Sequence, residues 1–302
     1  MARFGPLLTA MVTPFDDDGM VDYDAAATLA RWLGDNGSTG LVLAGTTGES
    51  PTLTDDEKIE LFRTVAEVVT IPVIAGVGSA DTRHSIELTR AAAATGVAGM
   101  LVVTPYYSRP SQAGLFAHFS AVAGATELPV IVYDIPPRTG RKVATATLVA
   151  LAREVPNVVA VKDATSNPYE SARLLSRTPD DFELYSGDDG FTLPLLAIGA
   201  VGVISVASHW AGDEMATMIT AFQKGDVGEA RRQNQQLLAS FAFETGDDAP
   251  NPLPAKAMMR VLGHRVGQCR PPMGPAPSGL EDDARRVLAD LRPSRPADEN
   301  HA

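Results

Sequence analysis

The sequence PVIVYDIPPRTGRKVATATLVALAREVPNVVAVKD, residues 129–163, carries the clearest indication of the fold. Two short apolar runs, Pro129–Tyr133 and Val158–Lys162, flank a segment with helical periodicity, Ala144–Glu154. Both runs are continuously apolar rather than alternating, which is typical of strands buried on both faces of a parallel sheet. The stretch therefore predicts a strand, a covering helix and a second strand parallel to the first.

The same unit repeats on both sides of this stretch. The expected strands are Leu7–Thr13, Gly40–Ala44, Pro72–Gly76, Gly99–Thr104, Pro129–Tyr133, Val158–Lys162, Phe182–Ser186 and Gly202–Val206. The helices expected between them include Tyr23–Asn36, Thr54–Val69, Thr82–Thr95, Ala113–Ala123, Ala144–Glu154 and Pro168–Arg177, and Thr54 with Glu57 predicts a capping box. About eight such units in about 220 residues predict an α/β fold, a (β/α)8 TIM barrel. An open doubly wound sheet is the alternative, but no dinucleotide or P-loop fingerprint follows any run.

Beyond the eighth unit the sequence stays helical. The expected helices are Ala211–Gln223, Val227–Glu244, Pro254–Leu262 and Leu280–Leu291. We therefore expect residues 1–224 to form the barrel that carries the active site, and residues 225–292 to form a C-terminal helical extension packed on it. Residues 293–302 are expected to be a disordered tail.

Composition excludes several classes of partner. The chain has 302 residues with 25 Lys and Arg against 37 Asp and Glu, a formal charge of −12. Such a surface repels phosphate backbones and anionic lipids, so no nucleic-acid or membrane partner is expected. Cys269 is the single cysteine and the five histidines are scattered, so neither a disulfide within the chain nor a metal site is expected. The N-terminus lacks the apolar stretch of a signal peptide, which makes the cytoplasm the expected location.

Lys162 is the first candidate for chemistry, because the active site of such a barrel lies at the carboxyl ends of its strands. A lysine that ends a fully apolar strand loses hydration, and this lowers its pKa toward that of a usable amine nucleophile. The alternative is a lysine that only forms a salt bridge. The chain has five lysines, and the position of this one on a barrel strand favours the nucleophile.

Other strand ends carry further candidates. Tyr133 is either a core aromatic with its hydroxyl at the rim or a phenol that transfers protons beside the lysine. Thr46 and Thr47 stand between two glycines, and their hydroxyls and backbone amides can bind a carboxylate or phosphate, unless the segment is an ordinary turn. Arg138 can hold a carboxylate in bidentate fashion, or it is a surface residue.

Two further segments are less decisive. Tyr106 and Tyr107 are consecutive and point in different directions, so at most one of them faces the opening of its own barrel. The other is better placed for packing or for a contact between subunits. The run Ser186–Asp189 is expected to be a tight turn rather than a metal loop.

Taken together, these residues resemble the dihydrodipicolinate synthase/N-acetylneuraminate lyase family of pyruvate-dependent class I aldolases. The resemblance covers about residues 5–290. It rests on the segments Gly45–Ser50, Val103–Tyr107, Tyr133–Gly140, Val161–Ala164, Ser186–Asp189, Gly202–Ser205 and Pro250–Lys256.

The resemblance implies a mechanism and a set of roles. Lys162 would form a Schiff base with pyruvate, and the resulting enamine would attack aspartate semialdehyde, a step toward diaminopimelate and lysine. Tyr133, Thr46 and Tyr107 match the proton relay of the family, in which the tyrosine matching Tyr107 comes from a neighbouring subunit. The residues that match binding positions are Thr47 and the Ile204 backbone for pyruvate, Arg138 for the semialdehyde carboxylate and Gly187 for the nearby wall.

The resemblance also implies a homo-oligomer, a tetramer built as a dimer of dimers, with no metal and no other cofactor. One alternative is a lyase or dehydratase of the same superfamily that acts on 2-keto-3-deoxy sugar acids or N-acetylneuraminate. The pair Thr46–Thr47 and Arg138 favour the semialdehyde instead. A non-catalytic barrel used for binding is the other alternative, and intact Lys162 and Tyr133 argue against it.

A further expectation concerns regulation. Lysine-inhibited members of the family bind lysine near the position of Tyr106, with a His and a Glu that receive its charges. Lys58 and His84 match those positions here. A cationic Lys58 would oppose the ammonium groups of lysine, and His84 supplies no carboxylate, so we expect little or no feedback inhibition.

Overall fold

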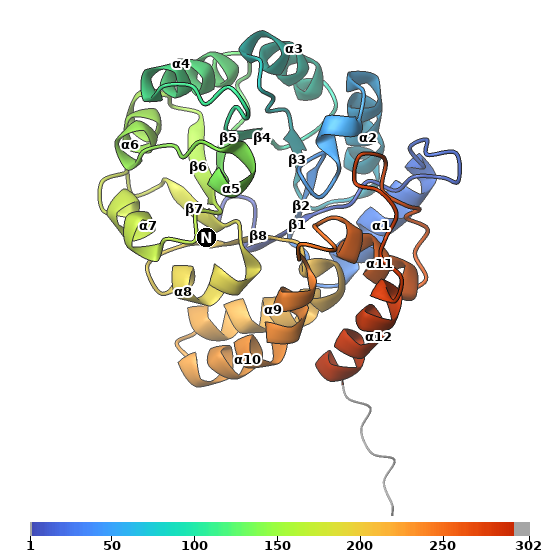
Figure 1. Cartoon of the computed structure of the whole chain (residues 1–302). Helices are drawn as coiled ribbons and strands as arrows, with labels where there is room; N and C mark the ends of the chain where they lie inside the picture. Colours follow the sequence, from blue (N-terminus) through green and yellow to red (C-terminus); the bar gives the residue numbers. More distant parts are fainter. Residues whose placement is uncertain (1, 293–302) are drawn as a thin grey trace, which may run out of the picture.

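Eight parallel strands close into a barrel in the computed structural model, which describes residues 2–292 (Figure 1). The strands are β1 (Leu7–Ala10), β2 (Gly40–Leu43), β3 (Val73–Gly76), β4 (Gly99–Val103), β5 (Val130–Asp134), β6 (Val158–Asp163), β7 (Glu183–Ser186) and β8 (Gly202–Ser205). Leu8 closes the barrel, because it pairs with Gly40 of β2 on one side and with Ile204 of β8 on the other. The predicted barrel and all eight predicted strands are confirmed.

Helices surround the barrel and cover its outer face (Figure 1). They are α1 (Tyr23–Asp35), α2 (Asp55–Val68), α3 (Thr82–Ala93), α4 (Gln112–Ala123), α6 (Thr145–Glu154), α7 (Pro168–Leu175), α8 (Thr192–Leu196) and α9 (Ser208–Gln223). The predicted capping box begins α2: Thr54 Oγ1 accepts from the Glu57 amide at 3.2 Å, and Glu57 accepts from the Thr54 amide at 2.8 Å. Each helix buries an apolar stripe against the outer faces of the strands, which explains why the strands are apolar on both faces.

Two short helices differ from the expectations. The loop after β5 contains α5 (Pro136–Thr139), which ends at Gly140 with a φ of 68°, and α8 follows β7. Pro at the first helical positions presets the backbone of α5, and a glycine tolerates the left-handed angle that ends it. Both helices are too short for a periodic pattern. The first strand is also shorter than predicted and ends at Ala10 instead of Thr13.

The C-terminal helices pack beside the barrel. α10 (Val227–Phe243) lies against α9 and α12 (Leu280–Leu291), and α11 (Leu253–Val261) packs on α12 (Figure 1). The boundary expected at 224 falls between α9 and α10, while the expectation of a disordered tail concerns residues 293–302, which lie outside the described residues. Within residues 2–292, none of the helices combines the length and the apolar composition that crossing a membrane requires.

The barrel interior is filled by side chains. An inner cluster contains Leu8, Val42, Ile74, Leu101, Ile131, Tyr133, Ala160, Tyr185 and Ile204, contributed by all eight strands. A second and larger cluster lies between the strands and the helices. Because the interior is packed, an open site forms only where the strands end.

Candidate active site

A cavity of about 240 Å³ lies at the carboxyl ends of β2 to β5. Its lining includes Thr46, Tyr106, Tyr133 and Arg138, together with small residues such as Gly76 and Gly78. Three of the residues proposed from the sequence therefore meet in one cavity. Small residues keep the opening wide enough for a ligand.

Lys162 lies next to Tyr133, although it is not among the residues that line this cavity. Its strand β6 pairs with β5 so that Lys162 stands beside Tyr133, and Nζ is 4.4 Å from the centroid of the Tyr133 ring. The lysine is only 5% exposed. Burial lowers the pKa of Lys162 to about 8, although the charges of Asp189 and Glu244 act against this decrease. An amine with this pKa is partly neutral near pH 7, as a nucleophile requires.

Tyr133 keeps its phenolic proton in this environment. Burial raises the pKa of Tyr133 to about 12, while the neighbouring Thr46 and Arg138 act in the opposite direction. A phenol that stays protonated beside a partly neutral amine can donate a proton to a reacting oxygen and take it back. The two groups therefore place a nucleophile next to an acid at the ends of β5 and β6.

The segment after β2 forms a tight turn that separates its two threonines. Thr46 lines the cavity, whereas Thr47 is buried and its Oγ1 accepts from Asn251 Nδ2 at 2.9 Å. Gly48 permits the turn, because a Cβ there would lie 2.9 Å from the Ala44 backbone nitrogen. The Glu49 amide donates to the Thr46 carbonyl at 3.1 Å and closes the turn.

The other candidate residues lie around the same end of the barrel. Arg138 lines the cavity from α5, and its Nη2 lies 3.5 Å from the Asn251 carbonyl oxygen. Ile204 is buried in the barrel interior on β8. Gly187 follows β7, where a Cβ would lie 2.9 Å from the Cβ of Ala164, so only glycine fits without a shift of its neighbours.

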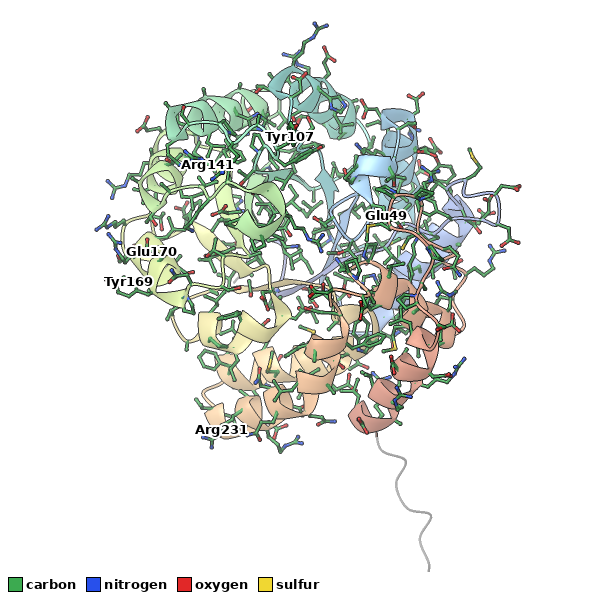
Figure 2. The ribbon with its side chains drawn as sticks, in the orientation of Figure 1. Glu49, Tyr107, Arg141, Tyr169, Glu170 and Arg231 are labelled. Atoms are coloured by element: carbon green, nitrogen blue, oxygen red, sulfur yellow. The ribbon has the colours of Figure 1, made fainter. Side chains whose placement is uncertain are left out.

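Tyr107 is not brought to the cavity of its own chain. Tyr106 lines the cavity, while Tyr107 is 95% exposed and has a left-handed backbone with a φ of 70°. Figure 2 shows Tyr107 near α3 and α4, apart from Glu49 on the α2 side of the barrel opening. The prediction that at most one of the two tyrosines faces the opening is confirmed.

Three polar residues near the site were given no role in the sequence analysis. Asn251 contacts Thr47, and it lies in the Pro250–Lys256 segment that was quoted only as part of the resemblance. Asp189 Oδ2 accepts from the amides of Val206 and Ala207, both at 2.8 Å. Burial and the neighbouring Asp189 raise the pKa of Glu244 well above its usual range.

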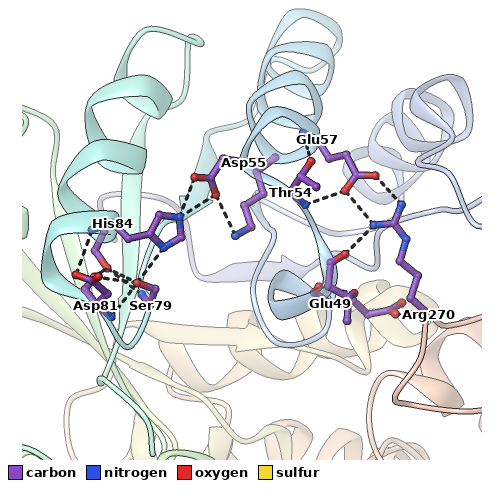
Figure 3. A network of polar contacts seen from close by, with 11 residues as sticks. Glu49, Thr54, Asp55, Glu57, Ser79, Asp81, His84 and Arg270 are labelled. Atoms are coloured by element: carbon purple, nitrogen blue, oxygen red, sulfur yellow. Dashed lines mark hydrogen bonds and ion pairs between the residues drawn. The ribbon is translucent and has the colours of Figure 1, made fainter. Parts of the chain in front are cut away.

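The positions matched to lysine binding form a polar network (Figure 3). Asp55 lies 2.8 Å from His84 Nε2 and 3.7 Å from Lys58 Nζ, and His84 Nδ1 lies 3.2 Å from Ser79 Oγ. Asp55 is a carboxylate that the sequence analysis did not consider. It forms an ion pair with Lys58, and burial lowers the pKa of that lysine.

Comparisons with known proteins agree on one family. Residues 3–291 match the sequence model of the Dihydrodipicolinate synthetase family. The 4-hydroxy-tetrahydrodipicolinate synthase of Moorella thermoacetica is 50% identical over 294 residues, which cover 96% of this chain and 98% of that protein. The enzyme of the same name from Bacillus subtilis is 46% identical over 289 residues, covering 95% and 98%.

Solved structures give the same result. A dihydrodipicolinate synthase from Bacillus anthracis superposes with a TM-score of 0.92 at 43% identity, covering 98% of this chain and all of that one. The dihydrodipicolinate synthase of Cyanidioschyzon merolae, solved with lysine bound, has a TM-score of 0.92 at 44% identity and covers 95% and 98%.

Proposed function

Because the chain belongs to the dihydrodipicolinate synthetase family, we propose that it condenses pyruvate with L-aspartate 4-semialdehyde to 4-hydroxy-tetrahydrodipicolinate. This reaction belongs to diaminopimelate and lysine biosynthesis. The observation that supports it most is the buried Lys162, whose amine lies beside the protonated Tyr133 at a cavity open at the strand ends.

The reaction begins at Lys162. Its neutral amine attacks the keto carbon of pyruvate, and the carbonyl oxygen leaves as water, which gives a Schiff base. The iminium withdraws electrons, so the methyl group loses a proton and becomes an enamine. Tyr133, with Thr46 beside it in the cavity lining, carries the protons of these steps.

The second substrate then reacts with the enamine. The enamine carbon attacks the aldehyde carbon, and the aldehyde oxygen takes up a proton from the relay. The amine of the adduct attacks the Schiff-base carbon, closes the ring and displaces Lys162, which regains its free amine. Arg138, at the cavity wall, is suited to hold the semialdehyde carboxylate. Thr47 and the Ile204 backbone are assigned to pyruvate, and Gly187 to the nearby wall.

Tyr107 supports a proposal about assembly. Its side chain is exposed, and a non-glycine residue with a positive φ is strained, which suggests a function for its position. We assign it to the proton relay of a neighbouring subunit, in a homotetramer built as a dimer of dimers. In this proposal residues 225–292 are a helical extension of the barrel, and the enzyme is cytoplasmic.

Feedback inhibition by lysine is proposed to be weak. Asp55 is occupied by Lys58 and His84, so an incoming ammonium group would have to compete with a cation already in place. Activity that falls by half below millimolar lysine would contradict this proposal.

A coupled assay tests the function. Purified protein, pyruvate and aspartate semialdehyde are mixed with excess dihydrodipicolinate reductase and NADPH, and NADPH absorbance is followed. We expect rapid oxidation that depends on the protein, and a borohydride-trapped pyruvate adduct on Lys162. An adduct without NADPH oxidation would indicate a pyruvate-dependent enzyme of the same superfamily that acts on sugar acids instead of the semialdehyde. No adduct at all would indicate a barrel that does not form a Schiff base with pyruvate.

A further inference from the structure

We propose that the C-terminal segment 251–270 is a functional part of the pyruvate site, because Asn251, Lys256 and Glu49 position the turn that carries Thr46 and Thr47. The inference rests on the proposed function, which assigns these threonines to the proton relay and to pyruvate. It makes the three residues positioning residues, since none of them lines the cavity itself.

Asn251 contacts both Thr47, which is assigned to pyruvate, and Arg138, which is assigned to the semialdehyde. Asn251 is 7% exposed, and its Nδ2 donates to Thr47 Oγ1 at 2.9 Å. With the Thr47 oxygen used as an acceptor, its hydroxyl hydrogen is free to be donated to a carboxylate. The backbone carbonyl oxygen of Asn251 lies 3.5 Å from Arg138 Nη2. One residue therefore contacts the side chains assigned to the carboxylates of the two substrates.

The second contact holds the end of the turn. Glu49 has a left-handed backbone with a φ of 56°, which is unfavourable for a side chain of this size. Such a conformation persists only when the surroundings impose it. Two partners from the C-terminal segment do so: Glu49 Oε1 lies 2.7 Å from Lys256 Nζ, and Glu49 Oε2 accepts from the Arg270 amide at 2.8 Å.

The third observation is the burial of this ion pair. The side chains of Lys256 and Glu49 are 1% and 2% exposed, and Lys256 Nζ also donates to the Gln268 carbonyl at 3.0 Å. The ammonium lies 3.9 Å from the centroid of the Phe15 ring, and the guanidinium of Arg270 lies 4.3 Å from it. An apolar pair of similar volume often stabilises a protein at least as much as a buried ion pair does. Stability alone therefore does not explain the two buried charges of Lys256 and Glu49. Together with the hydrogen bond from the Arg270 amide, the ion pair holds the Glu49 carboxylate in one place and so restricts the turn.

The experiment compares three variants with a matched control. Asn251→Ala removes the bond to Thr47, Lys256→Met leaves Glu49 without its partner, and Glu49→Gln combined with Lys256→Met removes both charges. The control is Glu281→Gln, which loses the 2.8 Å ion pair with Arg260 in the same C-terminal helices. For each protein, the borohydride-trapped adduct is measured by mass spectrometry against pyruvate concentration, and Tm is measured alongside.

We expect Asn251→Ala and Lys256→Met to raise the half-saturating pyruvate concentration about tenfold, which corresponds to about 1.4 kcal/mol. The double variant should recover part of this loss, because it leaves no unpaired buried charge. Glu281→Gln should lower Tm without any change in half-saturation.

Two results would separate the possible failures. A wild-type protein that forms no adduct would overturn the proposed function. A normal wild type, with half-saturation unchanged in Asn251→Ala and only Tm lowered, would overturn the positioning role alone. If Lys256→Met does not fold, Asn251→Ala still decides, because it leaves the ion pair intact.

Discussion

Replacing Lys162 by Met should stabilise the folded chain at neutral pH while it abolishes the pyruvate adduct. Burial lowers the pKa of Lys162 from its usual 10.5 to about 8. The difference, 10.5 − 8 = 2.5, corresponds to about 3 kcal/mol of folding free energy. Methionine has a similar shape and carries no charge, so the packing change should be small.

The sign of the pH dependence follows from proton binding. Between pH 8 and 10.5 the folded chain binds fewer protons at Lys162 than the unfolded chain does, so wild-type stability rises with pH there. The penalty is complete below about pH 8 and disappears above about pH 10.5. Lys162→Met should therefore gain about 3 kcal/mol at pH 7 and under about 1 kcal/mol at pH 10.

Equilibrium urea unfolding at fixed protein concentration, from pH 7 to pH 10 and without pyruvate, measures this difference. Lys224→Met, at an exposed position after α9, is the control and should change stability by no more than about 0.5 kcal/mol at any of these pH values. A Lys162→Met protein that is less stable than wild type at pH 7, or a gain that does not shrink as pH rises, would refute the reasoning.

The same free energy has a catalytic use. At pH 7 an amine with a pKa of about 8 is about 9% neutral, whereas one with a pKa of 10.5 is about 0.03% neutral. The stability that the fold gives up at Lys162 therefore increases the reactive form about 300-fold.

Three further predictions concern single residues. Tyr133→Phe should lower kcat by about 100-fold or more, because it removes the phenolic proton. The borohydride-trapped adduct should also accumulate more slowly in samples quenched at successive times. Tyr107→Phe should lower kcat and leave the pyruvate dependence of trapping close to that of wild type; unchanged turnover would exclude a relay across subunits. Thr54→Ala breaks the capping box of α2 and should cost about 1 kcal/mol in urea unfolding, whereas a loss near zero would mean that the box adds nothing to the helix.

The barrel could be predicted from the sequence because its signals are local. Each strand is a short apolar run, and a helix of several turns repeats its apolar stripe often enough to be recognised. The short helix α5 has no such repeat, since Pro136–Thr139 is little more than one turn. The end of β1 was predicted too late because Met11 and Val12 are apolar and buried although they lie beyond the strand.

The site was predictable to the extent that strand position determines it. Lys162 and Tyr133 end neighbouring strands, so the barrel brings them together wherever the helices lie. The contacts of Thr47 with Asn251 and of Glu49 with Lys256 join residues about 200 positions apart, and no local pattern indicates them. Asp55 was missed for a similar reason, because its partner His84 lies on another helix, 29 residues further along the chain.

The bond between Asn251 and Thr47 has a consequence for how the protein is made. The turn that carries Thr47 leaves the ribosome early. Asn251, the partner of Thr47, is made 204 residues later, and Arg270, whose amide binds Glu49, is made 221 residues after Glu49. At about 5–20 residues per second, these intervals last roughly 10 to 45 s. A nascent chain can thus carry all eight strands and Lys162 while its turn still lacks these partners, so a fragment released before residue 251 would hold the nucleophile without the contacts of Thr47 and Glu49 with the C-terminal segment.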